Sequence, residues 1–463
     1  MSKYLAIDIG ASSGRAIVAD LTSALYLDEI NRFDIDIIRS SDERLNLNKL
    51  SADINQSIQI ALEKYEDIES IGIDTWAVDT VAIDHNGMPV SNPMFYRDES
   101  FVNSLNDYSK ANDLYELYQR TGIQIQAFNT FFQMQVAANN YNIKDVSNFM
   151  MLPDYLAYTL CGVKSLEFTN ATTTQSINLQ TNRFECEHRD KFIEITNQRI
   201  LGNLKPEFAN GRSIKVVSVA THDTSSAILA IPHLQKSDAF LSSGTWSLLG
   251  KHVDKPIINY QAYEYNYSNE GNYDRTYRFQ KNIMGLWVIV SYAKENHLED
   301  FAELNELAKA STIESLIDIN DQTFMNPSSM TVAIIEYCKL TSQEVPDTVG
   351  DFSRVIYRSL AHSYKVALAE LEIASGEAIE SLTIVGGGAK AQFLNEEIAK
   401  VIDQKLRLFP YECSALGNVL VQAIEMGQFN NLQEAHDYVS KHMKIYTQEK
   451  ENEKFRNYKK RCN

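Results

Sequence analysis

Apolar residues follow two periods along the chain, and the two periods alternate as far as about residue 426. Short runs rich in Val, Ile and Leu are typical of strands, whereas apolar positions recurring every three to four residues indicate helices. Strands are predicted over residues 4–9, 15–21, 70–74, 78–84, 215–220, 239–241, 246–250, 382–385 and 406–408. Helices are predicted over residues 51–65, 113–120, 130–139, 154–160, 224–231, 352–374, 391–402 and 414–426. The Asn- and Thr-rich stretch 168–178 follows neither period, and we expect it to be irregular or strand-like.

One short plan occurs twice in this pattern. Residues 4–21 predict a β-hairpin around a glycine-containing turn at 10–14, and residues 239–250 predict a second hairpin around the turn at 242–245. Alternating strands and helices are typical of layered α/β folds. We therefore expect an N-terminal α/β domain over 1–235 and a C-terminal α/β domain over 236–440, followed by a basic tail over 441–463.

Composition and charge narrow the classes of partner. The chain has 463 residues, enough for two to four domains of ordinary size, and a net charge of −18. An acidic surface disfavours nucleic acid and anionic membranes, because both attract basic proteins. The tail 441–463 alone carries a charge of +5 and is typical of a solvated, partly helical chain end.

The cysteines and the hydropathy predict a cytoplasmic protein without a membrane span. Five cysteines are spread along the chain without CxxC spacing, which argues against a zinc cluster and favours reduced thiols. No run of about 18 apolar residues is long enough to cross a bilayer. We expect small-molecule partners and a monomer or a homodimer.

The turn after the first strand carries residue types that suit a phosphate. Gly10 and Gly14 permit positive φ and let the backbone approach a ligand closely. Ser12 and Ser13 add hydroxyl donors, and Arg15 adds a fixed positive fork. The turn therefore predicts a phosphate-binding loop.

Asp8 ends the strand before this turn, where it can hold Mg²⁺ through water. Two alternatives compete for the turn itself. It can be a plain hairpin turn, or, since residues 10–14 match Gly-x-Ser-x-Gly, the nucleophile elbow of a hydrolase. The elbow requires a helix directly after the serine, whereas residues 16–20 favour a strand.

A second glycine cluster, Gly386 to Gly388, lies between a predicted strand and a predicted helix. With Ala391 it fits Gly-x-Gly-x-x-Ala, a weak dinucleotide fingerprint, and Glu412 stands at a tolerable distance for a ribose contact. Too little chain follows for a complete doubly wound unit. The chain also lacks a Gly-x4-Gly-Lys-[Ser/Thr] loop, which excludes a Walker-type ATPase. With or without a dinucleotide-binding unit, the start of the predicted helix can face an anion or a nucleotide.

The tetrad Thr221, His222, Asp223 and Thr224 lies between a predicted strand and a short predicted helix. Asp223 is then an N-cap, for which Asp and Thr are preferred, or an ionised carboxylate that accepts a proton from a substrate hydroxyl. Other polar and aromatic residues are of the types that bind sugars. They are Asp74, Trp76, Asp79, Tyr96, Asn129, Gln133, Asp154, Asn170 and Asn282.

Taken together, these stretches resemble the FGGY family of carbohydrate kinases, in order over nearly the whole chain except the tail. The resembling segments are residues 8–15, 71–76, 118–123, 153–155, 169–175, 222–224, 241–247, 281–287, 384–388 and 416–418. The resemblance implies a duplicated, actin-like ATPase fold of ribonuclease H type, with two domains around a central cleft. The runs 169–175 and 281–287 point to the branch of the family that acts on L-rhamnulose.

The implied reaction is ATP-dependent phosphorylation of L-rhamnulose at O1, with Mg²⁺, in L-rhamnose catabolism. By the same resemblance Asp223 is the catalytic base, and Asp8 is the carboxylate on the Mg²⁺ side. The implied sugar contacts are Ala77, His222, Asp223, Thr224 and Asn282. The implied ATP contacts are Ala11, Ser12, Ser13, Gly14, Arg15, Thr245 and Gly387.

Two positions depart from the family pattern. Ala77 stands where the family has glycine, and its methyl group is expected to narrow the sugar pocket. Val290 replaces a polar residue near ATP, and we expect weaker nucleotide binding from it. Alternatives that stay open are a kinase for L-fuculose or L-xylulose, a non-catalytic sugar or nucleotide sensor on the same fold, and an NAD-dependent oxidoreductase.

Overall fold

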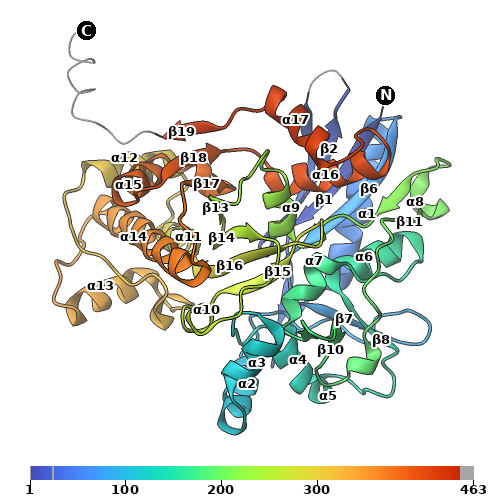
Figure 1. Ribbon diagram of the computed structural model, residues 1–463, viewed down its shortest axis with the longest axis horizontal. Helices are drawn as coiled ribbons and strands as arrows, with labels where there is room; N and C mark the ends of the chain where they lie inside the picture. The colour runs from blue at the N-terminus through green and yellow to red at the C-terminus, as the bar shows by residue number, and fades with distance from the viewer. Residues whose placement is uncertain (1, 23–24, 449–463) are drawn as a thin grey trace. The chain divides into compact units, whose positions relative to one another are not determined.

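The computed structural model describes residues 2–22 and 25–448, and each of its two large sheets contains a β-hairpin (Figure 1). In the first hairpin, β1 (Lys3–Ile9) pairs antiparallel with β2 (Ser13–Asp20). In the second, β13 (Asp238–Ser243) pairs antiparallel with β14 (Trp246–Val253). Both predicted hairpins are confirmed.

The described chain forms two compact units that are not continuous in sequence. The first unit contains residues up to 233 together with 253–279 and 412–443. The second contains residues 234–252 and 280–411 and the described residues from 444 on. The chain thus returns to the first unit twice after residue 235, the point at which a single division is predicted. A domain boundary at 235 stays a prediction.

The sheet of the first unit has the strand order β11-β12-β6-β1-β2-β3. β1, β6 and β12 run parallel, and the hairpin strand β2 and the outer strand β3 continue the sheet in antiparallel fashion. The remaining strands of this unit are β3 (Tyr26–Asp34), β4 (Ile37–Arg39), β5 (Glu43–Leu45), β6 (Ile68–Thr75), β7 (Thr80–Ile83), β8 (Asn148–Met151), β9 (Ile177–Asn178), β10 (Arg183–Phe184), β11 (Ile200–Asn203), β12 (Lys215–Val217) and β15 (Ser268–Gly271).

The helices of the first unit are α-helices and short 3-10 turns. They are α1 (Leu47–Lys64), α2 (Ser100–Ala111), α3 (Leu114–Thr121), α4 (Thr130–Gln135), α5 (Ala137–Asn140), α6 (Leu152–Cys161), α7 (Phe168–Ala171), η1 (Thr172–Thr174), η2 (Arg189–Lys191), α8 (Pro206–Ala209), α9 (Asp223–Leu229), α10 (Tyr260–Glu264), α16 (Cys413–Glu425) and α17 (Leu432–His442). In the part of the chain that the structure describes, no helix is both long and apolar enough to span a bilayer.

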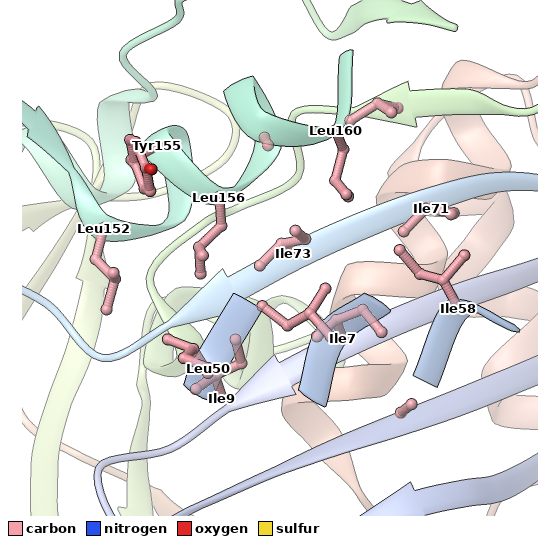
Figure 2. Close-up of a cluster of buried hydrophobic side chains, with 14 of the residues drawn as sticks. Ile7, Ile9, Leu50, Ile58, Ile71, Ile73, Leu152, Tyr155, Leu156 and Leu160 are labelled. Carbon is pink, nitrogen blue, oxygen red and sulfur yellow. The ribbon is translucent and has the colours of Figure 1, made fainter. Parts of the chain in front are cut away.

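An aliphatic core fills the space between the sheet and helices α1 and α6 (Figure 2). Ile7 of β1 and Ile73 of β6 face Leu156 of α6, and all three are at most 3% exposed. Burying a side chain of this size stabilises the fold by about 1.5–3 kcal/mol. The core fixes the two parallel strands whose carboxyl ends carry Asp8 and Asp74.

Helix α16 also packs on β1 and β6, and it does so through polar contacts. Its Gln422 donates to the Leu5 carbonyl (3.0 Å) and accepts from Ser70 (2.7 Å), and Asn418 donates to Asp74 Oδ2 (2.6 Å). Gly417 lets α16 approach α9, because a Cβ there would lie 1.8 Å from the Ser226 carbonyl oxygen.

The second unit repeats this plan. Its strands are ordered β14-β13-β17-β18-β19, with β13, β17 (Ser381–Val385) and β18 (Lys405–Phe409) parallel, and the division between the units falls within β16 (Tyr277–Met284). Its further elements are α11 (Trp287–Glu295), α12 (Phe301–Ala310), η3 (Gln322–Phe324), α13 (Met330–Leu340), α14 (Val349–Ser375), η4 (Gly387–Lys390), α15 (Gln392–Val401) and β19 (Tyr446–Gln448).

The stretch 168–178 differs from its prediction. Residues 168–174 form α7 and η1, and only Ile177–Asn178 is a strand. Glu167 caps α7 by accepting from the Thr169 amide, and the hydroxyls of Thr172, Thr173 and Thr174 bond back to carbonyls three or four residues earlier. The threonine hydroxyls thus find acceptors within these short helical turns, which the threonine-rich sequence does not predict. Of the predicted tail, residues 441–442 end α17, residues 446–448 form β19, and residues 449–463 lie outside the described residues.

Candidate active site

The turn between β1 and β2 is closed by its own backbone. Gly10 donates its amide hydrogen to the Ser13 carbonyl (3.0 Å). Gly10 and Gly14 do not use the positive φ that glycine permits, because neither is among the positive-φ glycines. Gly14 is required for another reason: a Cβ there would lie 2.2 Å from the Phe33 ring of β3. Because β2 follows directly, a hydrolase elbow is excluded.

The guanidinium of Arg15 is bound by two carboxylates of the first unit. Its guanidinium donates to Asp8 (2.8 Å from Nε) and forms an ion pair with Glu412, the residue before α16. Burial opposes the charge, but Asp8 and Glu412 outweigh it and raise the pKa of Arg15. Ser414 also donates to Asp8 Oδ2 (2.6 Å). The expected ribose contact of Glu412 is therefore not supported, since its carboxylate holds Arg15 instead.

The carboxylates of Asp8 and Asp74 lie near the carboxyl ends of β1 and β6, and that of Asp223 lies at the start of α9. Asp8 and Asp74 stand in register across β1 and β6, and both are almost fully buried. Burial, then the charges of Asp8 and Asp223, raise the pKa of Asp74 well above its ordinary value. Asp74 Oδ2 accepts from Asn418, whereas Oδ1 accepts no hydrogen bond from a described donor. The site concentrates negative charge that a bound cation or a shared proton would relieve.

Asp223 is the first residue of α9, one residue before the predicted start of this helix. The segment before Asp223 is held by a backbone hydrogen bond, in which the Thr75 amide donates to the Thr221 carbonyl (2.9 Å). The N-cap is His222, and Asp223 Oδ1 accepts from the amide of the next residue, Thr224 (2.5 Å). The N-cap interpretation of Asp223 is therefore wrong.

The Asp223 carboxylate is partly open. Its side chain keeps 29% of its surface exposed, while His222 Nε2 lies 3.4 Å from Oδ1. Surrounding protein raises the pKa of Asp223, His222 lowers it, and Asp8 raises it further. A carboxylate that combines access with a raised pKa is a stronger proton acceptor than an ordinary aspartate.

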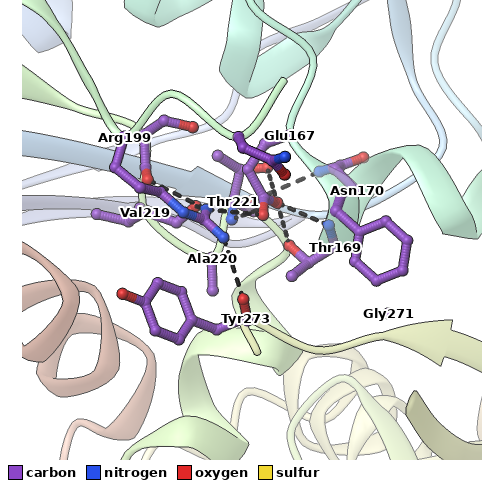
Figure 3. Close-up of polar contacts among 12 residues, drawn as sticks. Glu167, Thr169, Asn170, Arg199, Val219, Ala220, Thr221, Gly271 and Tyr273 are labelled. Atoms are coloured by element: carbon purple, nitrogen blue, oxygen red, sulfur yellow. Dashed lines mark hydrogen bonds and ion pairs between the residues drawn. The ribbon is translucent and has the colours of Figure 1, made fainter. Parts of the chain in front are cut away.

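A buried polar network, centred on Glu167, contacts Thr221 (Figure 3). Glu167 Oε2 accepts from the amide and hydroxyl of Thr169 (2.8 and 2.5 Å) and of Thr221 (3.3 and 3.1 Å). Arg199 balances its charge through Oε1 (3.0 Å), and the Thr169 hydroxyl accepts from the His222 amide (3.2 Å). Sequence reasoning missed Glu167 and Arg199, because a buried ion pair has no periodic signature.

The loop after β6 carries Ala77 and is held under strain. Val78 has φ +68°, a conformation that costs a β-branched residue about 1–3 kcal/mol. Asp79 closes the loop by accepting from Trp76 Nε1 (2.8 Å), Gln133 Nε2 (3.1 Å) and the Tyr96 amide (3.3 Å). Burial raises the pKa of Asp79 to about 7. Strain that surrounding contacts maintain is common at ligand sites.

The second unit holds Thr245, Asn282 and Gly387. Thr245 lies in the turn between β13 and β14, Asn282 in β16, and Gly387 begins η4. Gly386 has φ +79°, and a Cβ there would lie 2.8 Å from the Ser243 carbonyl oxygen, so the two glycine-containing turns pack together. Val290 of α11 is 43% exposed.

The structure thus brings the predicted residues together in two groups. In the first unit Asp8, Arg15 and Asp223 share one electrostatic environment, in which Asp8 contacts Arg15 and acts on Asp223. His222 and Thr224 flank Asp223 directly. In the second unit the Thr245 turn lies against the Gly386 turn.

Two family models match the chain. The N-terminal domain of the FGGY family of carbohydrate kinases matches residues 3–230, and its C-terminal domain matches residues 239–426. A protein of Oceanobacillus iheyensis named rhamnulokinase is 35% identical over 96% of this chain and 97% of its own length. One of Bacillus subtilis with the same name is 36% identical, over 96% of this chain and 95% of its own.

Solved structures show the same fold at low sequence identity. A xylulose kinase from Lactobacillus acidophilus has a TM-score of 0.80 at 13% identity and covers 99% of this chain and 96% of its own. A Plasmodium falciparum glycerol kinase with ADP has a TM-score of 0.77 at 16% identity, over 100% of this chain and 96% of its own. The predicted actin-like ATPase fold is confirmed.

Proposed function

Because the chain belongs to the FGGY family of carbohydrate kinases, we propose that it transfers the γ-phosphoryl group of ATP to O1 of L-rhamnulose, in L-rhamnose catabolism. The products are L-rhamnulose 1-phosphate and ADP. The observation that carries the choice of sugar is the similarity, over nearly the full length, to several relatives named rhamnulokinase. We place the reaction in the cytoplasm, where ATP is made.

Asp223 is the base in this proposal. Its carboxylate accepts the proton of the sugar 1-hydroxyl while that oxygen attacks the γ-phosphorus, and the phosphorus–oxygen bond to ADP breaks. What supports the role is the 29% exposure of the side chain together with its raised pKa. General bases contribute about 10²- to 10⁴-fold to rate. His222 and Thr224, with Ala77 and Asn282, are the proposed sugar contacts.

The phosphates are assigned to the turn that runs from Ala11 to Arg15, and Thr245 and Gly387 are assigned to ATP. The net charge of −18 opposes an anionic ligand, so local amides and cations must hold it. Arg15 serves by keeping Asp8 in place, since two carboxylates already occupy its guanidinium. We expect its contribution to phosphate binding to pass partly through the residues it orders.

The carboxylates of the first unit suit a Mg²⁺ ion that is bound through water. Among the described residues no group of three or more His, Cys, Asp or Glu is arranged to hold a metal ion directly. Mg²⁺ usually keeps several waters and binds one or two carboxylates besides substrate phosphates. The concentrated charge of Asp8 and Asp74 and the Asp74 Oδ1 without a described donor suit that mode. When bound, the ion neutralises charge on the β- and γ-phosphates.

A ketose panel tests the substrate. The full-length enzyme is assayed with ATP and Mg²⁺ against L-rhamnulose, L-fuculose and L-xylulose, and ADP release gives kcat/KM for each sugar. We expect L-rhamnulose to rank first by at least tenfold. A higher kcat/KM for another ketose would overturn the assignment within the family. Sugar-induced thermal stabilisation without any ADP release would favour a sensor instead.

A further inference from the structure

The imidazole of His222 is enclosed by a buried ion pair that the assigned chemistry does not use. Glu270 lies in β15 and Arg278 in β16, and their side chains are 7% and 0% exposed. Arg278 Nη2 lies 3.2 Å from Glu270 Oε2. Both residues belong to the first unit, through the segment 253–279. Two charges taken out of water in this way are costly unless they are paired and hydrogen-bonded.

Both members of the pair also reach the same nitrogen of His222. Glu270 Oε2 lies 3.3 Å and Arg278 Nη2 3.0 Å from Nδ1. The other ring nitrogen, Nε2, lies 3.4 Å from Asp223 Oδ1. The imidazole therefore lies between the Glu270–Arg278 ion pair, on its Nδ1 side, and the Asp223 carboxylate, on its Nε2 side.

Arg278 is anchored from behind. It donates through Nη1 to the Gly271 carbonyl and to Asn272 Oδ1 (3.2 Å), so its fork cannot turn without losing several bonds. Contacts with His222 and Arg278 outweigh burial and lower the pKa of Glu270 to about 2. Glu270 is then ionised at neutral pH, and the pair carries no net charge toward the ring.

We infer that Glu270, supported by Arg278, is a positioning residue that holds the imidazole of His222 with Nε2 toward Asp223 during phosphoryl transfer. The inference rests on the proposed kinase function. An unheld imidazole would rotate about its χ angles and leave Asp223 without its neighbour. A displacement of about 1 Å in a catalytic contact can cost about 100-fold in rate.

A double-mutant cycle separates positioning through His222 from a general effect on the fold. Glu270→Gln removes the charge and keeps the shape. His222→Asn keeps a polar atom near the position of Nδ1 and deletes Nε2. We expect E270Q to lower kcat about 10- to 100-fold in the wild-type background, with the KM for ATP within twofold. In the H222N background E270Q should change kcat by less than twofold.

Glu167→Gln is the matched control. Glu167 is also a buried glutamate of an ion pair, but it acts on the backbone of Thr221 and through Thr169, not on the imidazole. Its effect on kcat should therefore be of similar size with and without the H222N change. Thermal unfolding of each variant checks that the fold is intact.

An equal loss from E270Q in both backgrounds would overturn the inference. If E270Q does not fold, the same cycle is run with Glu270→Asp, which keeps the charge and withdraws the carboxylate by one methylene, and the same criterion applies. A wild-type enzyme that phosphorylates no ketose would overturn the proposed function, and the inference with it. An active wild type with additive variants would overturn the inference alone.

Discussion

Replacing Asp79 by asparagine is expected to stabilise the protein progressively, relative to the wild type, as the pH rises from 5 to 8. The Asp79 carboxyl is 2% exposed and accepts hydrogen bonds from Trp76, Gln133 and the Tyr96 amide. Asparagine has the shape of the protonated acid but cannot ionise. The substitution therefore removes the cost of burying a charge in the loop that Val78 already strains.

The magnitude follows from the pKa of Asp79, which burial raises from 3.8 to about 7. Each pKa unit corresponds to about 1.4 kcal/mol. Between pH 3.8 and 7 the folded state keeps a proton that the unfolded state releases, so the contribution of this group to stability falls as the pH rises. The total is about 4 kcal/mol, of which about 3 kcal/mol falls between pH 5 and pH 8.

Thermal unfolding at half-unit pH steps measures the effect. At about 2 °C per kcal/mol, the Tm of D79N minus that of the wild type should rise by about 5 °C between pH 5 and pH 8. A change in hydrogen bonding adds an offset that does not depend on pH. Asp84→Asn is the control, because hydrogen bonds from Met88 and Asn86 lower the pKa of Asp84 and keep it ionised throughout this range. A Tm difference between D79N and the wild type that stays constant from pH 5 to pH 8 would show that Asp79 does not titrate in this range.

Two further predictions concern packing and specificity. Gly417→Ala should lower the Tm by several degrees, because a Cβ there meets the Ser226 backbone and overpacking costs about 1–3 kcal/mol. Gly202→Ala is the control: its Cβ would have ordinary contacts, so the Tm should stay within about 1 °C of the wild type. Equal Tm shifts for the two variants would contradict the close packing of α16 on α9. Ala77→Gly should change the ratio of kcat/KM between L-rhamnulose and L-fuculose by about tenfold, the effect of one methyl group in a pocket; an unchanged ratio in the ketose panel would remove Ala77 from the sugar site.

The framework of the first unit was predictable from the sequence because it rests on periodicity. β1 and β2 are runs of buried aliphatic residues around a turn, and the same pattern recurs at β13 and β14. Asp8 and Asp223 could be singled out because acidic residues at strand ends or helix starts stand out from their apolar neighbours. Gly14 of the first turn stands out in the sequence, but it is required because a Cβ there would meet the Phe33 ring and not because of a positive φ.

The supporting shell could not be predicted in this way. Glu167, Glu270 and Arg278 are buried, Arg199 is partly buried, and all four are paired, yet in sequence they look like surface residues. β15 shows the difficulty: Ser268–Gly271 is a buried strand without an aliphatic residue, so hydropathy gives no signal for it. Pairings between residues more than 30 positions apart, such as Glu167 with Arg199, arise only once the chain has folded.

The most direct test of the account is the product formed from L-rhamnulose and ATP by the wild type and by Asp223→Asn. Phosphorus NMR should show L-rhamnulose 1-phosphate forming in equal amount to ADP with the wild-type enzyme. D223N should lose at least 100-fold in kcat while still binding the sugar in calorimetry, whereas Asp113→Asn, the same change at the N-cap of α3, should stay within twofold. A D223N variant that keeps more than about a tenth of the wild-type rate, a barrier change under about 1.4 kcal/mol, would contradict the assignment of Asp223 as the base.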